Sequence, residues 1–276
     1  HQPMANEDRS ICVVFNGEIY NHKALRQELE AKGHRFTSRC DTEVIPHLYE
    51  ELGDGFLQKL RGMFAIALWD TRSRRLLLAR DRVGVKPLYY RLTPNGLFFG
   101  SELKCLLPTP GFERRVDSES VQCYLSSLYI AAPKTIFSDA HKLAPGHILK
   151  YQDGECEVEP YWDLAFRSDG PSTLAESADA VQAGLEDAVK VRMESDVPMG
   201  AFLSGGLDSS LIVAIMAKHS STPIKTFTVG FGGESSGYSE LPFAREVANA
   251  FGTDHHECQV DYNVVDLLPK IIWHFD

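Results

Sequence analysis

The first half of the chain alternates short apolar runs with turn-forming residues. Residues 10–15 form a continuous apolar run that predicts a buried strand, and we expect Asn16-Gly17 to end it. Further extended stretches, separated by polar and turn-rich pieces, span residues 63–69, 75–80, 88–92 and 97–100. Asp153-Gly154, between two more apolar stretches, predicts a hairpin. Strands joined by such short turns indicate an antiparallel sheet.

Three helices are expected among these strands. The first follows Asn21, which can cap it, and Gly33 ends it. Its apolar stripe consists of Ala24, Leu25 and Leu29. The second spans residues 42–52, and its apolar side is formed by Val44, Ile45, Leu48 and Leu52. The third is expected at residues 116–128. Strands and short helices together indicate an α+β domain.

The second half of the chain alternates helices with strands. Apolar residues recur at steps of three and four and predict a helix whose buried stripe is formed by Leu174, Ala178, Val181, Leu185, Ala188 and Val189. Strands at 199–203, 224–229 and near 256–260 then alternate with helices at 211–218 and 240–250, as in a parallel α/β unit. We expect domains at residues 1–160 and 174–276, with a linker at 161–173.

Composition excludes several classes of protein. The chain has 276 residues and a net charge of −10, which argues against a nucleic acid or an anionic membrane surface as its partner. The six cysteines are too scattered for CxxC metal or redox motifs and indicate reduced thiols in a cytoplasmic protein. No long uncharged apolar run predicts a membrane segment.

The segment Ser204-Gly205-Gly206-Leu207-Asp208-Ser209-Ser210 stands between a predicted strand and a predicted helix. The glycines allow the backbone to approach an anion, the serines offer hydroxyl donors, and the helix would direct N–H groups and its positive dipole end at that anion. Asp208 would repel phosphates unless Mg²⁺ bridges it to them. No lysine follows as in a Walker A loop. The plainer alternative is a Gly-Ser turn that caps an ordinary helix.

The first half of the chain carries a series of motifs in a fixed order. Asn16-Gly17-Glu18-Ile19-Tyr20-Asn21 is followed by distinctive stretches at residues 39–45, 61–65 and 79–90. This set resembles the glutaminase domain of class II glutamine amidotransferases, and the segment 204–210 resembles the pyrophosphatase loop of ATP-dependent amide ligases. Together they are similar to the glutamine-hydrolysing asparagine synthetase family over nearly the whole chain. The resemblance implies an Ntn-hydrolase-like αββα sandwich followed by a Rossmann-like, parallel-sheet ATP-pyrophosphatase domain.

The resemblance also implies an activity. Members of this family use glutamine and ATP to amidate a carboxylate through an acyl-adenylate, with aspartate converted to asparagine and AMP, pyrophosphate and glutamate released. ATP and Mg²⁺ would be required, and all partners would be small molecules. Two alternatives stay open: another acceptor, such as a sugar acid or a β-lactam precursor, or a catalytically silent protein that binds glutamine or a nucleotide. The sequence leaves the oligomeric state undetermined, with a homodimer open.

Site residues follow from the motif positions. Asn16, Gly17 and Glu18 would line the glutamine site, with Asn16 and Gly17 stabilising the oxyanion, and Asp41 would pair with the substrate's α-ammonium. The resemblance assigns ATP binding to Leu203, Ser204, Gly205, Gly206, Asp208, Ser209, Ser210 and Val229. Asp208 would hold Mg²⁺ through pyrophosphate. Leu203 and Val229 are apolar and have a plain core role as the alternative. Arg80, Asp81, Arg82 and Lys86 are expected to form a charged structural turn.

One feature departs from the family. Class II glutaminases use a cysteine at the mature amino terminus, whose own amino group activates the thiol. Residue 1 here is His1, and Cys12 lies inside a predicted strand. We therefore assign no nucleophile and expect the chain to be inactive as a glutaminase as given. We expect it to be a fragment lacking both ends, with the nucleophile upstream of His1 and the second synthetase loop downstream of Asp276.

Overall fold

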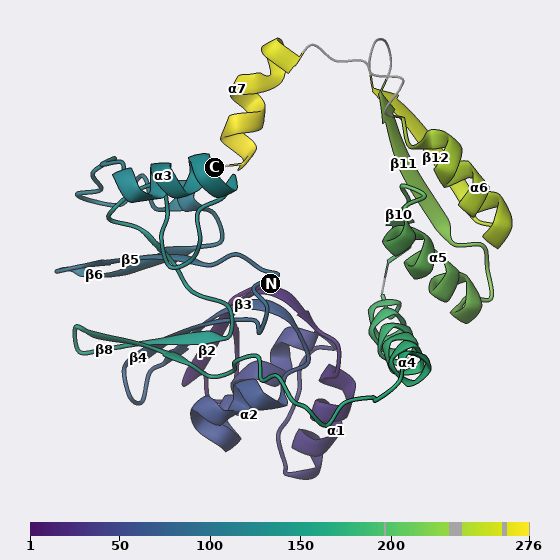
Figure 1. Ribbon diagram of the computed structural model, residues 1–276. Helices are drawn as coiled ribbons and strands as arrows, with labels where there is room; N and C mark the ends of the chain where they lie inside the picture. Colours follow the sequence, from purple (N-terminus) through teal and green to yellow (C-terminus); the bar gives the residue numbers. More distant parts are fainter. Residues whose placement is uncertain (196, 232–238, 261–263, 276) are drawn as a thin grey trace. The chain divides into compact units, whose positions relative to one another are not determined.

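The computed structural model describes residues 1–195, 197–231, 239–260 and 264–275 (Figure 1). Its internal contacts divide the chain into two compact units, which meet between Ala165 and Phe166. This division falls inside the segment 161–173 that the sequence analysis assigned to a linker. Each unit is described by itself.

A six-stranded antiparallel sheet forms the centre of the first unit. Its strands lie in the order β1 (Met4–Ala5), β2 (Ile11–Ile19), β3 (Gly62–Asp70), β4 (Arg75–Arg80), β8 (His147–Gln152) and β9 (Glu155–Pro160). The predicted hairpin joins β8 to β9. Asp153 and Gly154 both have positive φ angles, 51° and 90°, which match the twist of a two-residue hairpin turn.

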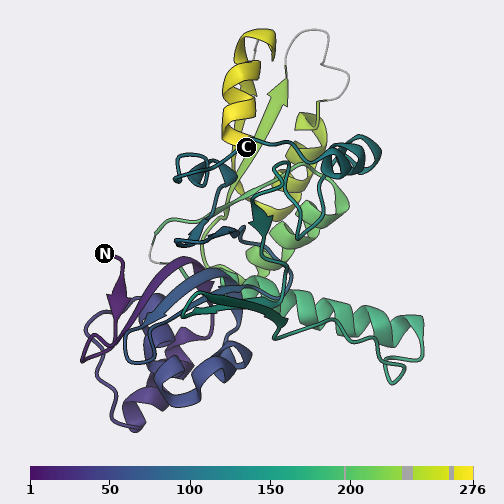
Figure 2. The same ribbon diagram turned by 90° about the vertical axis from the view of Figure 1, so that its left-hand side faces the viewer.

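Two helices cover one face of this sheet, α1 (His22–Ala31) and α2 (Val44–Leu52), as Figure 2 shows. Two 3₁₀ segments, η1 (Asp41–Glu43) and η2 (Gly53–Lys59), flank α2. Leu25 and Leu29 of α1 and Ile45 of α2 are buried against the sheet in one apolar cluster. The predicted stripes are too wide at their margins, because Ala24 and Leu52 lie at the edge of the contact and are exposed.

The other face of the sheet packs against a second, three-stranded antiparallel sheet, with the order β6 (Gly96–Gly100), β5 (Tyr89–Thr93) and β7 (His141–Lys142). Ala67, Leu78 and Leu149 fill the space between the two sheets together with Leu88 and Leu143. Beyond the second sheet lie η3 (Leu103–Cys105) and α3 (Ser118–Ser127) (Figure 1). The layers run helix, sheet, sheet, helix, which confirms the predicted αββα sandwich.

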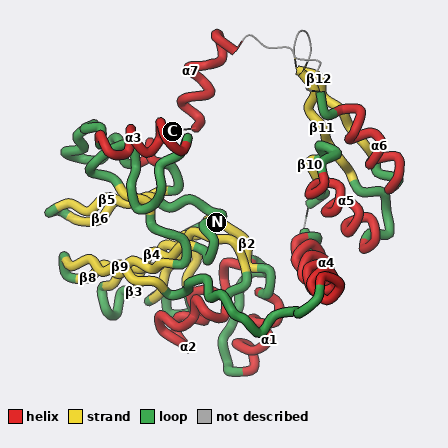
Figure 3. Tube along the Cα trace, viewed as in Figure 1, coloured by secondary structure: helices red, strands yellow, loops and turns green. Residues whose placement is uncertain are grey.

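The second unit is built on a parallel sheet. Its strands lie in the order β10 (Gly200–Phe202), β11 (Lys225–Phe231) and β12 (Asp254–Val260). Helix α5 (Leu207–His219) connects the first two strands, and α6 (Leu241–Phe251) connects the second pair (Figure 3). Helices α4 (Leu174–Arg192) and α7 (Val264–Phe275) precede and follow the sheet. This confirms the predicted parallel α/β unit.

The predicted buried stripe of α4 is wrong for most of its length. Val189 is buried and Leu185 is partly buried, against Ile215 and Met216 of α5. Leu174 is 88% exposed and Val181 is 60% exposed, because α4 meets α5 only through its C-terminal half. Across the described part of the chain, no helix combines the length and the apolar character that a membrane crossing requires.

Candidate functional site

Asn16, Gly17 and Glu18 lie within strand β2. The sequence analysis expected Asn16-Gly17 to end the strand, but β2 continues to Ile19 and pairs with β3 throughout. The reason is a close contact with the neighbouring strand. A Cβ at residue 17 would lie 2.1 Å from the carbonyl oxygen of Met63 on β3, so only glycine lets the strands approach this closely. The polar side chains are therefore presented from a rigid strand, not from a loop.

Asn16 meets a partner that lies far away in the sequence. Its Nδ2 donates a hydrogen bond of 3.1 Å to Oγ of Ser101, which follows β6. Both residues line a hollow of about 270 Å³ in the first unit, and its mainly apolar lining includes Phe15, Ala67 and Leu88. Nothing in the sequence indicated Ser101, because the contact depends on how the two sheets pack.

The side chain of Asp41 contacts the C-terminal end of β2. It is the first residue of η1, and its Oδ2 accepts a hydrogen bond of 2.8 Å from the N–H of Ile19. Its Oδ1 lies 3.2 Å from Oγ1 of Thr42 and 3.4 Å from Sγ of Cys40. The structure thus brings Asp41 next to Glu18, although 22 residues of sequence separate the bonded pair Ile19 and Asp41.

The loop that carries Asp41 is held by a buried carboxylate. Glu43 is only 2% exposed and accepts four hydrogen bonds from the N–H and hydroxyl groups of Thr37 and Ser38. Burial alone would raise the pKa of Glu43, but the hydrogen bonds from Ser38 and Thr37 outweigh it and hold the pKa below its ordinary value. An ionised Glu43 therefore fixes residues 37–43 around the site.

Two residues of the charged segment after β4, Arg80 and Asp81, make the structural contacts that the sequence analysis expected of this turn. Asp81 is 1% exposed, and its carboxylate accepts main-chain N–H groups from Phe64, Val83, Val85 and Lys86. Arg80 donates to three main-chain carbonyls in and near the same turn. The charged groups of Arg80 and Asp81 are therefore engaged in hydrogen bonds to main-chain atoms in and near the turn.

The loop after β10 in the second unit is tightly constrained. Gly205 has a φ angle of +80°, and a Cβ there would lie 2.5 Å from the carbonyl carbon of Phe243 and 2.7 Å from the nitrogen of Ala244. Only glycine satisfies both the backbone angle and this contact with α6. Inside the loop, the hydroxyls of Ser204 and Ser209 lie 3.0 Å apart, and Gly206 N–H donates to Ser204 Oγ at 3.2 Å.

Helix α5 begins at Leu207, four residues before the helix that the apolar pattern predicted at 211–218. Asp208, Ser209 and Ser210 are therefore in its first turn. The N-cap is Gly206, and no side chain caps the helix, which leaves first-turn N–H groups pointing out of the helix. Oγ of Ser210 is buried and has no hydrogen-bond partner within the described chain.

This arrangement fits a phosphate group and a magnesium ion. A glycine held at positive φ, uncapped N–H groups and three serine hydroxyls all lie at the positive end of α5, where anions are stabilised. Asp208 is exposed in the same turn, and carboxylate oxygen is a ligand that Mg²⁺ prefers. A bound cation would remove the repulsion between this carboxylate and a phosphate.

The two apolar residues assigned to the nucleotide behave differently from each other. Leu203 is 1% exposed and packs with Val213 and Ala244, so its side chain is part of the core. Its carbonyl accepts a hydrogen bond from the hydroxyl of Thr228, a contact that the sequence analysis missed. Val229, by contrast, is 42% exposed on β11 and is not a core residue.

Comparisons with known proteins match both units. Residues 1–162 match the family model of the glutamine amidotransferase domain, and residues 180–276 match the model of asparagine synthase. The asparagine synthetase [glutamine-hydrolyzing] 1 of Bacillus subtilis is 39% identical over 280 residues, covering 100% of this chain and 43% of the relative. The asparagine synthetase [glutamine-hydrolyzing] 3 of Arabidopsis thaliana is 36% identical, again covering 100% of this chain and 43% of the relative.

The match to these proteins is partial in length. This chain spans somewhat less than half of each of these two curated relatives. Among solved structures, a glutamine phosphoribosylpyrophosphate amidotransferase from B. subtilis, complexed with ADP and GMP, is 17% identical and covers 93% of this chain and 48% of that chain, with a TM-score of 0.42.

Proposed function

Because this chain belongs to the family of glutamine-hydrolysing asparagine synthetases, we propose that it contributes to both sites of a glutamine-dependent amide ligase. The first unit would bind glutamine and help release its amide nitrogen as ammonia. The second would bind ATP and activate a carboxylate. The observation that carries this proposal is the loop at Gly205, which is fixed by its contact with α6 at the uncapped start of α5.

The proposed glutamine site uses complementary charge at the end of β2. Asp41 would pair with the α-ammonium of glutamine, since a carboxylate gives a charge-assisted hydrogen bond to that group. The N–H of Ile19 uses only part of the capacity of the Asp41 carboxylate to accept hydrogen bonds. Asn16 has two N–H donors on its amide, and Ser101 accepts one, so the other is available to an oxyanion. Gly17 and Glu18 would complete the lining.

The attack on glutamine needs a thiolate, and we assign this role to no residue of the chain. Cys12 lies within β2, between β1 and β3, and is not an amino-terminal residue whose own amino group could act as its base. The roles of Asn16, Gly17 and Asp41 are therefore binding and oxyanion stabilisation alone.

The proposed ATP site uses the first turn of α5. Main-chain N–H groups of this turn and the hydroxyls of Ser204, Ser209 and Ser210 would bind the phosphates, and Leu203 and Val229 would flank the nucleotide. Asp208 would hold Mg²⁺ through pyrophosphate. When bound, the ion would neutralise phosphate charge and favour departure of pyrophosphate as the carboxylate attacks the α-phosphorus of ATP.

The proposed acceptor is aspartate, so that the product is asparagine and the by-products are AMP, pyrophosphate and glutamate. The support is the similarity to relatives that are named glutamine-hydrolysing asparagine synthetases. Pyrophosphate release by the protein that contains this chain, measured with aspartate and with a panel of other carboxylic acids, tests the acceptor. Release that is indifferent to aspartate but responds to another acid would reject it.

Binding of ATP in the presence of Mg²⁺ tests the second site directly. We expect isothermal titration calorimetry to show binding by the chain, and Asp208→Asn to weaken it at least tenfold while leaving the fold intact. The matched control is Asp179→Asn, which removes an exposed carboxylate from α4 and should bind like the unaltered chain. Equal affinity of all three proteins would contradict the role of Asp208.

A further inference from the structure

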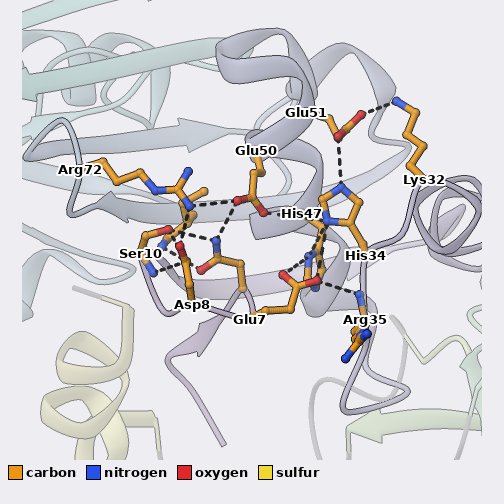
Figure 4. Close-up of polar contacts among 12 residues, drawn as sticks. Glu7, Asp8, Ser10, Lys32, His34, Arg35, His47, Glu50, Glu51 and Arg72 are labelled. Carbon is orange, nitrogen blue, oxygen red and sulfur yellow. Dashed lines mark hydrogen bonds and ion pairs between the residues drawn. The ribbon is translucent and has the colours of Figure 1, made fainter.

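A cluster of two histidines and two glutamates lies in the first unit and shares no residue with the sites described above (Figure 4). Glu7 precedes β2, His34 follows α1, and His47 and Glu50 stand one turn apart on α2. One potential ligand atom from each of the four residues lies within 4.8 Å of all the others. Three separate segments of chain therefore converge on a single small volume.

The distances within the cluster approach those around a tetrahedral metal ion. The Nδ1 atoms of His34 and His47 lie 3.2 Å apart, and Nδ1 of His47 lies 3.4 Å from Oε2 of Glu7. Nδ1 of His34 lies 3.9 Å from Oε2 of Glu50. Zinc bonds of about 2.0–2.1 Å to nitrogen and oxygen place neighbouring ligand atoms about 3.3 Å apart. Side-chain shifts of a fraction of an ångström to about one ångström would bring all four ligand atoms within bonding distance of one ion.

The outer atoms of these side chains already have partners that orient them. Nε2 of His34 lies 3.2 Å from Oε1 of Glu51, which leaves Nδ1 to face the cluster. Oε1 of Glu7 accepts the N–H of Arg35 at 2.8 Å, which leaves Oε2. Metal-binding histidines and carboxylates are usually held by such outer hydrogen bonds.

Glu50 is oriented in the same way. Its Oε1 accepts hydrogen bonds from Asn6 at 3.3 Å and from Arg72 at 3.1 Å, which leaves Oε2 directed at His34. The fourth group, His47, is 1% exposed and is fixed by burial. Its Nε2 has no hydrogen-bond partner among the described residues, so this ligand lacks the outer contact that the other three have.

The inner atoms of the cluster include more hydrogen-bond acceptors than donors. With the proton of neutral His34 on Nε2, its Nδ1 and the inner oxygens of Glu7 and Glu50 are all acceptors. A single proton on Nδ1 of His47 can serve His34 or Glu7, but it does not serve all three acceptors. A divalent cation would satisfy the four inner atoms together. The competing arrangement is an additional proton, which places an imidazolium among the carboxylates.

We propose that Glu7, His34, His47 and Glu50 form a structural site for a divalent transition-metal ion, with Zn²⁺ as the best match. Two imidazole nitrogens and two carboxylate oxygens suit Zn²⁺, and four protein ligands are typical of a structural site, not a catalytic one. The ion would tie the start of β2 to the end of α1 and to α2. His34 leads directly into residues 37–43, so the ion would also restrain the loop that carries Asp41.

Direct metal titration tests this proposal, and it is independent of the proposed enzymatic function. We expect the chelator-stripped chain to bind one equivalent of Zn²⁺ by isothermal titration calorimetry. Co²⁺ should give the visible absorption of a tetrahedral site with nitrogen and oxygen ligands. Glu7→Gln and His34→Gln should each weaken binding at least tenfold, and Glu51→Gln about 10–100-fold, as for other outer-sphere partners.

The controls separate this site from other metal-binding groups. Both Glu7→Gln and His34→Gln alter partly exposed side chains, so they avoid the destabilisation expected from a change at buried His47. His256→Gln and Glu28→Gln alter residues outside the cluster and should leave the affinity unchanged. Absence of stoichiometric binding at millimolar Zn²⁺ would overturn the proposal. So would unchanged affinity in Glu7→Gln and His34→Gln, or a thiolate-to-cobalt charge-transfer band, which would assign the metal to cysteines.

Discussion

The N–H of Ile19 donates a hydrogen bond of 2.8 Å to Oδ2 of Asp41, and this bond joins the end of β2 to the start of η1. It fixes a carboxylate beside Asn16, Gly17 and Glu18, the other residues of the proposed glutamine site. The bond itself needs only an oxygen acceptor, whereas the proposed interaction with glutamine needs the negative charge. The two roles of Asp41 can therefore be separated by one substitution.

Asp41→Asn should weaken glutamine binding about 10–100-fold, since a hydrogen bond to a charged group contributes about 1.5–3 kcal/mol. The amide oxygen of asparagine still accepts the N–H of Ile19, so the melting temperature should change little. Calorimetric titration with glutamine and thermal unfolding measure the two effects. Asp163→Asn, at an exposed position outside the site, is the control. A variant that binds glutamine as tightly as the unaltered chain would remove Asp41 from the site.

Gly205→Ala should disrupt the loop in front of α5. The new residue would have to adopt a φ of +80° and would place its Cβ 2.5 Å from the main chain of Phe243. We expect a loss of about 2–4 kcal/mol in the free energy of unfolding of the second unit, together with weaker binding of Mg-ATP. Urea unfolding followed by circular dichroism measures the loss.

The matched control for this loop is Gly184→Ala. Gly184 lies in the exposed middle of α4, and a Cβ there meets no atom within 4 Å. Alanine favours a helix over glycine by about 0.5–1 kcal/mol, so this variant should be neutral or slightly more stable. Similar losses in both variants would show that Gly205 has no special constraint.

Local patterns predicted those parts of the fold that depend on nearby residues. The hairpin at Asp153-Gly154, the strand at 75–80 and the α/β alternation of the second half all follow from short-range periodicity and turn chemistry, and the structure contains them. The continuation of β2 through Gly17 did not follow, because it depends on the close approach of Met63 on another strand. An Asn-Gly pair has the same appearance in a turn and in this strand.

The candidate sites divide in the same way. The loop at 204–210 is contiguous, so the sequence alone indicated its residues, although not the four-residue extension of α5 or the contact of Gly205 with α6. The pair Asn16 and Ser101 depends on the packing of two sheets. In the proposed metal site, only His47 and Glu50 had a readable signal, their spacing of three on one helix. Glu7 and His34 join them through the tertiary fold.

Asp81→Asn should destabilise the first unit without altering the proposed glutamine site. The carboxylate of Asp81 is buried and accepts four main-chain N–H groups, and an asparagine amide would turn its own NH₂ donors toward two of them. We expect a loss of about 1.5–3 kcal/mol in the free energy of unfolding. Arg82→Gln, at the exposed neighbour, should change it by less than about 0.5 kcal/mol. Loss of glutamine affinity in a stably folded Asp81→Asn variant would instead give this turn a role in binding.

Stability in acid should depend on Glu43. Its pKa in the folded chain is lower than the ordinary value of 4.5, because hydrogen bonds from Ser38 and Thr37 outweigh the effect of burial. The unfolded chain therefore takes up the proton first as the pH falls. The stabilisation by Glu43 is complete above about pH 4.5 and is lost as the pH drops through the folded pKa.

Glu43→Gln, which leaves buried donors unpaired, should cost about 1–3 kcal/mol at pH 7. Its deficit relative to the unaltered chain should shrink below pH 4.5. Urea unfolding at pH 7 and at several acidic values measures this, with Glu28→Gln as the exposed control. His47 on α2 lies near residue 43 in the unaltered chain and in the Glu43→Gln variant. The effect of its protonation on stability therefore largely cancels when the two free energies of unfolding are subtracted. A deficit that stays constant with pH would show that Glu43 acts through packing and not through its charge.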